Sequence, residues 1–184
     1  MEEQIRLFWI PIFLQPEERR TVKATFSSGN CVIQFPRQML GRKTQLLTTL
    51  DHVYWRLMGE LALPDLKQRT AELNQAFFKF HYRSVRYHRQ FRRWGSCSDR
   101  GNINLSHRLI GGPRELVDYV ILHELAHLQY LNHGPDFWRL VRSTGEEPQQ
   151  IRKAMTVYGR EWQYHYENWY RRLHQIIQSP KPKK

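Results

Sequence analysis

The amino-acid sequence predicts an α+β fold in which a small antiparallel or mixed sheet packs on helices, the last of them long. Short stretches of alternating apolar and polar residues predict the strands, and segments with apolar residues every three or four positions predict the helices. The 184 residues suffice for one domain that buries roughly 70% of its unfolded surface. We therefore expect a single domain over residues 1–178, followed by a disordered basic tail at 179–184.

The N-terminal half is predicted to contain a strand, a hairpin and two helices. Its expected elements are a strand at 5–14, a hairpin formed by 21–26 and 31–35, and helices at 46–61 and 65–77. Residues 27–30 supply the turn of the hairpin, and Pro64 stops the first helix. Asp65 is expected to cap the second helix.

The C-terminal half is predicted to alternate short strands with helices. Its expected elements are an extended segment at 84–93, a turn at 94–98, a strand at 102–106, and helices at about 113–131, 137–143 and 148–176. Asp136 is expected to cap the short helix, and Gly159 to bend the long one. The apolar stripe of the long helix predicts packing across the body of the domain, with a partner-binding face as the alternative.

Residues 123–127 carry a metal-binding pattern, His-Glu-Leu-Ala-His, and a further histidine follows at position 133. On a helix His123 and His127 lie one turn apart on the same face, so both imidazoles can reach one metal ion. Glu124 lies beside that ion without ligating it and can take a proton from a polarised water. With His133 as the third ligand, one tetrahedral position stays open for that water, as a catalytic zinc site requires.

The alternative is that these histidines are ordinary core residues. A chance match to the pattern has a probability of roughly 3 in 100 in a chain with nine histidines, and a third histidine at one fixed offset lowers it about twentyfold. Pro113 also suits the first turn of a helix that runs into the motif. This helix can be buried by Leu116, Val120, Leu125 and Leu128. The pattern therefore favours a metal site.

The charge of the chain predicts contact with polyanions. Its 29 Lys and Arg against 17 Asp and Glu give a formal net charge of +12. The excess is concentrated in segment 79–100, where aromatic residues interleave with cations, as in surfaces that bind single-stranded DNA or RNA. The candidate contacts are Arg83, Arg86, Arg89, Arg92 and Arg93. The alternative is that the aromatic side chains face the core and the arginines only solvate the outer side of a strand.

The cysteines and the N-terminus predict a soluble, cytoplasmic protein without membrane contact. Cys31 and Cys97 form no disulfide framework, which fits a reducing compartment. The first residues are acidic where a secretory signal would be basic, and no apolar run approaches the ~18 residues of a membrane span. Cys97 is expected to be a buried structural thiol, with a metal-bound thiolate as the alternative.

Five segments have a recognisable order and spacing, namely 93–98, 102–105, 119–128, 132–133 and 137–138. In this order they closely resemble the YgjP-like metallopeptidases, relatives of the SprT-like and WLM zinc proteases. The specific resemblance covers about residues 84–140, and the helical extension at about 146–178 is covered least. It implies a single zincin-like metallopeptidase domain over 1–178 with one Zn²⁺ ion per chain. It also implies His123, His127 and His133 as zinc ligands and Glu124 as catalytic base.

The spacing also resembles the metzincin pattern H-E-x-x-H-x-x-G-x-x-H, but Tyr130 occupies the glycine position. We therefore expect the helix to continue through Tyr130, with the turn delayed to 132–134, and we do not assign the chain to the metzincins. Tyr130 is also a candidate donor to the oxyanion, with an ordinary packed tyrosine as the alternative. The strand at 102–106 is a candidate edge strand for an extended substrate, with an inner strand as the alternative.

The sequence thus predicts a zinc metallopeptidase that hydrolyses peptide bonds in peptides or proteins, including proteins associated with nucleic acid. Two other functions stay open. A zinc-dependent hydrolase of non-peptide amides would use the same four residues. A nucleic-acid-binding protein would use the metal for folding only. The sequence does not set the oligomeric state.

Overall fold

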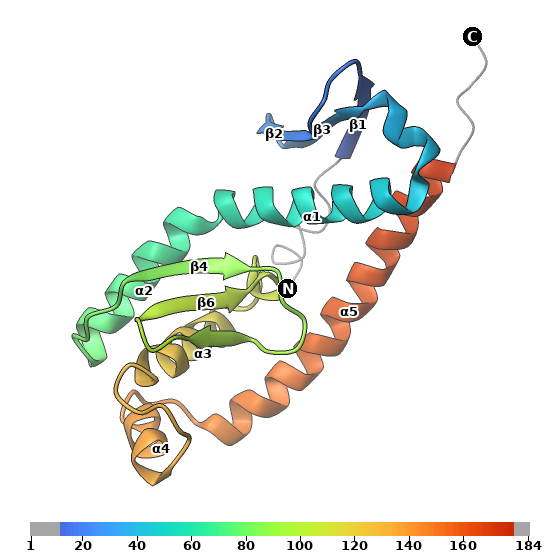
Figure 1. Cartoon of the computed structure of the whole chain (residues 1–184). Coiled ribbons are helices and arrows are strands. Elements are labelled where there is room, and N and C mark those ends of the chain that lie inside the picture. Colours follow the sequence, from blue (N-terminus) through green and yellow to red (C-terminus); the bar gives the residue numbers. More distant parts are fainter. Residues whose placement is uncertain (1–11, 179–184) are drawn as a thin grey trace. The chain divides into compact units, whose positions relative to one another are not determined.

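The computed structural model describes residues 12–178, which form two compact units (Figure 1). The first unit comprises the chain up to Met58 and again from Glu161, and the second comprises Gly59–Arg160. The basic tail at 179–184 and most of the strand expected at 5–14 lie outside the described residues. The single domain expected over 1–178 stays a prediction. Within the described part of the chain, no helix is both long enough and apolar enough to cross a membrane.

The first unit contains a three-stranded sheet with the order β1–β3–β2. Its strands are β1 (Ile12–Glu17), β2 (Lys23–Ser27) and β3 (Asn30–Pro36), and a 3-10 turn, η2 (Arg37–Gly41), follows. The expected hairpin is confirmed, because β2 pairs antiparallel with β3 and Ser27 stands opposite Asn30. Gly29 at the turn has φ of 78°, a conformation that only glycine adopts without cost. β1 lies parallel to β3 on the other side.

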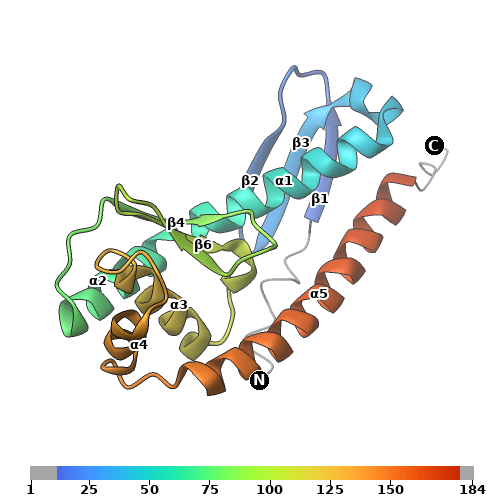
Figure 2. The same cartoon turned by 60° about the horizontal axis from the view of Figure 1, so that its bottom comes forward.

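The helical part of the first unit is held together by aromatic side chains. It consists of α1 (Lys43–Leu61) up to Met58 and of α5 (Pro148–Gln178) from Glu161 onward. The rings of Tyr54 and Trp169 have centroids 4.9 Å apart, and those of Trp55 and Trp162 are 5.8 Å apart. Trp162 is only 2% exposed. The prediction that the apolar stripe of α5 is buried is therefore confirmed for this part of the helix. In Figure 2, α1 runs obliquely over the strands of this unit.

The second unit contains a sheet with the order β4–β6–β5. Its strands are β4 (Ser84–His88), β5 (Gly95–Cys97) and β6 (Asn102–Ser106), and η3 (His107–Leu109) follows. Its helices are α2 (Leu63–Phe77), α3 (Arg114–Ala126), α4 (Pro135–Arg142) and the start of α5. α3 contacts β5 and β6 on one face of the sheet, while α2 contacts β4 and α3 (Figure 1). Ile103 and Leu105 of β6 and Ile121 and Leu125 of α3 are fully buried between them.

The edge of this sheet differs from the sequence-based expectation. The expected turn at 94–98 contains β5, which pairs antiparallel with β6 and forms one edge of the sheet. The strand at 102–106 lies inside the sheet, between β4 and β5, so the inner-strand alternative is the correct one. Three residues are too few for a visible alternation of apolar and polar side chains. The small residues of β5 therefore resembled a turn.

Several helix ends also differ from the expectation. α3 ends at Ala126 rather than near 131, because the N–H groups of Leu128 and Gln129 bond to carbonyls three residues back and tighten the last turn. The two predicted N-terminal capping residues were also wrong. α2 begins at Leu63 and α4 at Pro135, so Asp65 and Asp136 lie within the first turns, where their charge suits the helix dipole.

Candidate active site

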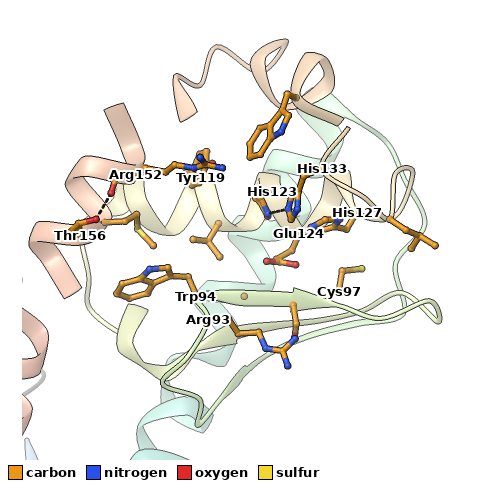
Figure 3. Close-up of a pocket in the computed structure, with 16 residues that line it drawn as sticks. Arg93, Trp94, Cys97, Tyr119, His123, Glu124, His127, His133, Arg152 and Thr156 are labelled. Carbon is orange, nitrogen blue, oxygen red and sulfur yellow. Dashed lines mark hydrogen bonds between the residues drawn. The ribbon is translucent and has the colours of Figure 1, made fainter. Parts of the chain in front are cut away.

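A cleft of about 730 Å³ opens in the second unit and is lined by residues of α3, β5, α4 and the first turns of α5 (Figure 3). α3 contributes Tyr119, Val120, His123, Glu124 and His127 to its wall. These positions follow the spacing of one helix face, so a single helix presents both histidines and the carboxylate to the same cavity. Figure 3 shows the Glu124 side chain pointing from α3 toward β5.

The three histidines of the motif meet in this cleft. His123 and His127 come from α3 and its C-cap, and His133 comes from the loop before α4. One ring nitrogen of each lies within 4.8 Å of the others. The Nε2 atoms of His123 and His133 are 3.0 Å apart. Two nitrogens on one tetrahedral zinc ion, each at about 2.0–2.1 Å, would be separated by roughly 3.3 Å, so this pair fits a shared ion.

The protonation states of these rings also fit a metal. The carbonyl of Tyr130 can only accept a hydrogen bond, and it lies 2.9 Å from Nδ1 of His127, so Nδ1 is the donor in this bond and Nε2 is the ring nitrogen available to a metal. Burial lowers the pKa of His123 to about 3, and the charges of His127, His133 and Arg152 act in the same direction. Burial and the charge of His127 also lower the pKa of His133. Neutral imidazoles are the form that binds metal.

Glu124 is a buried carboxyl group without a settled partner. It is 4% exposed, and its Oε2 has no hydrogen-bond partner among the residues that the structure describes. Burial raises the pKa of Glu124 to about 8, while the positive charge of Arg93 acts against this shift. A divalent cation beside the carboxylate would lower the pKa by Coulomb attraction. Nδ1 of His123 is likewise buried and without a hydrogen-bond partner in the described part of the chain.

Phe137 supports the three histidine rings from α4. Its ring is fully buried, and the centroid of this ring lies 4.9, 4.6 and 4.7 Å from the ring centroids of His123, His127 and His133, respectively. Trp138 packs against the hydrophobic core, lines the cleft and stacks on His133, with ring centroids 5.4 Å apart. The ring that packs against all three histidines is that of Phe137, because α4 begins at Pro135 and this places Phe137 on its buried face.

Tyr130 and Cys97 differ in their relation to the cleft. The Tyr130 side chain is not among the residues that line it, and the contribution of Tyr130 to the site is its backbone carbonyl. Its role as an oxyanion donor stays a prediction. Cys97 lines the cleft, and its thiol lies 3.5 Å from the carbonyl oxygen of Ser98. Burial raises the pKa of Cys97 to about 11, and its thiol is not part of the group of side chains that lie close enough together to hold a metal ion.

The five candidate arginines differ in burial, and the guanidinium carbon of Arg89 lies 5.0 Å from the centroid of the Phe91 ring. Arg89 is half-buried and the others are exposed: Arg83, Arg86, Arg92 and Arg93. Most aromatic residues between positions 77 and 94 pack against the hydrophobic core, namely Phe78, Tyr82, Tyr87 and Trp94. Phe77 and Phe91 are exposed. Contact of these arginines with nucleic acid stays a prediction.

Sequence reasoning missed the part of the cleft that α5 provides. Arg152, Met155 and Thr156 line it, and so does Trp94, which precedes β5. The ring of Trp94 also leaves little room for a side chain at position 159, because a β-carbon at Gly159 would lie 3.2 Å from that ring. The helical stripe of α5 included Met155 but gave no sign of what it contacts, since periodicity predicts a buried face and not its neighbour.

Comparison with known proteins places the chain in a family. No curated protein matches it. Among solved structures, the crystal structure of the metallopeptidase zymogen of Methanocaldococcus jannaschii jannalysin is similar, with 20% sequence identity and a TM-score of 0.45 over 50% of this chain and 94% of that chain. The family model described as the YgjP-like, metallopeptidase domain matches residues 10–158. Metallopeptidases depend on a divalent metal, typically zinc. Because the match spans most of the chain, this protein belongs to the YgjP-like metallopeptidase family and is a peptide-bond hydrolase.

Proposed function

We propose that the chain holds one Zn²⁺ ion on His123, His127 and His133 and hydrolyses peptide bonds with Glu124 as general base. The observation that carries this proposal is the meeting of three imidazole nitrogens within 4.8 Å in the cleft that Glu124 also lines. A donor set of three neutral imidazoles suits zinc and leaves one of four tetrahedral positions open. Harder cations such as Mg²⁺ and Ca²⁺ prefer oxygen ligands.

The chain's own residues supply the proton transfers. Zinc held by the three histidines would polarise the scissile carbonyl and the attacking water. The Glu124 carboxylate takes the proton of that water during the attack and then delivers it to the leaving amine. The carbonyl of Tyr130 keeps His127 in the tautomer that ligates through Nε2. The burial of Glu124, which is 4% exposed, limits the access of bulk water to its carboxyl group.

The edge strand β5 offers a track for the substrate backbone. It pairs with β6 on one side, and Gly95, Ser96 and Cys97 all line the cleft. An edge strand carries N–H and C=O groups that can pair with another chain, so an extended peptide can add beside β5 with its scissile bond near the histidines. Main-chain pairing of this kind does not depend on the side chains of the substrate.

The experiment that tests the proposal replaces Glu124 with Gln. We expect zinc content to be unchanged and cleavage of casein or a quenched fluorescent peptide to fall by at least about 100-fold, because the general base is removed and the ligands are kept. Glu115→Gln is the matched control, because Glu115 is exposed in the first turn of the same helix. Full activity of Glu124→Gln with bound zinc would contradict the assignment.

The remaining alternatives are separated by substrate. Turnover of small non-peptide amides in preference to peptides would favour the zinc amide hydrolase. Loss of folding on zinc removal without any hydrolytic activity would favour a structural site. Both would use the same histidines, so metal binding alone does not distinguish them.

Proteins associated with nucleic acid are the substrates that the exposed arginines favour, since Arg83, Arg86 and Arg92 can contact phosphates. Binding of a single-stranded oligonucleotide would then weaken steeply with salt, and replacing the three arginines by Gln would reduce the slope of log affinity against log salt by up to about 2. A control variant replaces three other exposed cations, Lys67, Lys153 and Arg171, by Gln. Equal slopes in the two variants would exclude this surface.

A further inference from the structure

The end of the cleft formed by α5 carries an exposed cation, Arg152. Its guanidinium carbon lies 5.0 Å from the centroid of the Trp138 ring, a cation–π distance. Across residues 12–178 it forms no ion pair with a carboxylate. The neighbouring Thr156 hydroxyl donates its hydrogen to the Arg152 carbonyl at 2.9 Å, so this hydrogen is not available to a ligand (Figure 3). Arg152 is therefore the polar group that this wall offers to a substrate.

Arg152 is close to the histidine cluster. Trp138 lies between them, because its ring stacks on His133 at 5.4 Å with an interplanar angle of 20° and also contacts the guanidinium. Stacking on Trp138 also restricts the long side chain and reduces the entropy lost on binding.

The cleft is cationic apart from its catalytic carboxyl group. Arg93 and Arg152 line it, and Glu124 is the one acidic residue among the lining residues. Glu124 is buried and points toward β5, so it does not neutralise Arg152. A cleft of one sign attracts ligands of the opposite sign. The planar guanidinium, with its fork of N–H donors, matches a carboxylate with two parallel hydrogen bonds.

We infer that Arg152 forms a carboxylate-binding subsite, so that the enzyme favours peptides with a carboxylate within about three residues of the scissile bond. This inference rests on the proposed function of the same cleft. An extended peptide advances about 3.3 Å per residue. The path from His133 to the guanidinium crosses one tryptophan ring, through spacings of 5.4 and 5.0 Å. The carboxylate can come from an Asp or Glu side chain or from the C-terminus of a short peptide.

The test measures binding and cleavage separately. Zinc-loaded Glu124→Gln protein is titrated with a peptide series in which each position within three residues of the scissile bond is Glu or Gln, with a free or amidated C-terminus. We expect the preferred carboxylate to raise affinity about tenfold over its amide counterpart at low salt, and less at high salt. Adding Arg152→Gln should abolish this preference and leave the affinity of the amide peptides unchanged. Arg152→Glu should transfer the preference to Lys.

The matched control is Lys153→Gln, which removes the same charge from the next position of α5 outside the cleft lining. It should keep the carboxylate preference. The Glu and Gln series identifies a side-chain carboxylate, and the free and amidated series identifies the C-terminus. Equal affinity for acid and amide peptides, or an equal loss for both in Arg152→Gln, would overturn the inference. Cleavage by the parent protein tests the proposed function by itself, since the affinity measurements do not require turnover.

Discussion

The backbone of Gly95 lies against the side chain of Glu124, so closely that a β-carbon at position 95 would come within 2.7 Å of Cγ of Glu124 and would overlap its carboxylate. The edge strand β5 and the helix α3 therefore approach each other at the one residue type without a side chain. Gly95 belongs to the segment that resembled a turn, yet it determines how close Glu124 can stand to β5.

Gly95→Ala should impair catalysis more than folding. The added methyl group must displace Glu124, and a shift of about 1 Å in a catalytic group can reduce turnover by about 100-fold. We expect zinc content to be retained and kcat to fall, as measured with a fluorescent peptide and by metal analysis. Gly41→Ala serves as the control, because nothing lies within 4 Å of a β-carbon there. Unchanged kcat in Gly95→Ala would contradict this packing argument.

Removal of His133 should release the metal. The variant His133→Ala leaves two imidazoles, and we expect zinc affinity to fall by more than about 100-fold, since loss of a residue that merely supports a ligand already costs 10–100-fold. Competition with a chelator measures the change. His81→Ala, which removes an exposed histidine outside the cleft, should bind zinc normally. Tight zinc binding without His133 would require another third ligand.

Phe137→Ala should destabilise the second unit and loosen the metal centre together. The side chain is fully buried against all three histidine rings, and truncation of a buried phenylalanine typically costs about 3–5 kcal/mol of unfolding free energy. Denaturant titration and zinc competition provide the two measurements. The matched variant Phe77→Ala should change stability by less than about 1 kcal/mol, because Phe77 is 46% exposed. Similar losses in both variants would contradict the role of Phe137.

His107 should make the protein less stable in mild acid. It is 1% exposed, and burial, with the charge of Arg89, lowers its pKa to about 3. The unfolded chain protonates this histidine near its ordinary pKa of about 6.5, so between these values the unfolded state binds more protons. The stability contributed by neutral His107 is present above about pH 6.5 and is lost as the pH falls toward 3.

Between pH 7 and pH 5 this loss amounts to about 2 kcal/mol of unfolding free energy. His107→Asn keeps an acceptor for the N–H of Gln90, which donates to His107 Nδ1 at 3.2 Å, but has no group that titrates in this range. Its unfolding free energy should therefore decline less than that of the parent protein over the same pH range. Parallel pH dependences in denaturant titrations would rule out the contribution of His107.

Much of the secondary structure could be read from the sequence because its signals are local. The hairpin of β2 and β3 follows from alternation around a turn, and α1, α2 and α5 follow from apolar spacing. The errors occurred where local signals were weak or competed. β5 has too few residues to show an alternation of apolar and polar side chains. α3 ends before the predicted residue 131 because its backbone tightens into a 3-10 turn just after Ala126.

The sequence by itself determined how His123, Glu124 and His127 are grouped, because one helical turn relates them and they need no long-range contact to lie on neighbouring positions of one face. Only the tertiary structure decided what surrounds them. The tertiary structure places Phe137 against the histidine rings and Gly95 against the side chain of Glu124. It also places Arg152 in the wall of the cleft. These contacts join separate elements, and packing between such elements depends on how their surfaces fit together, which periodicity within one element does not encode.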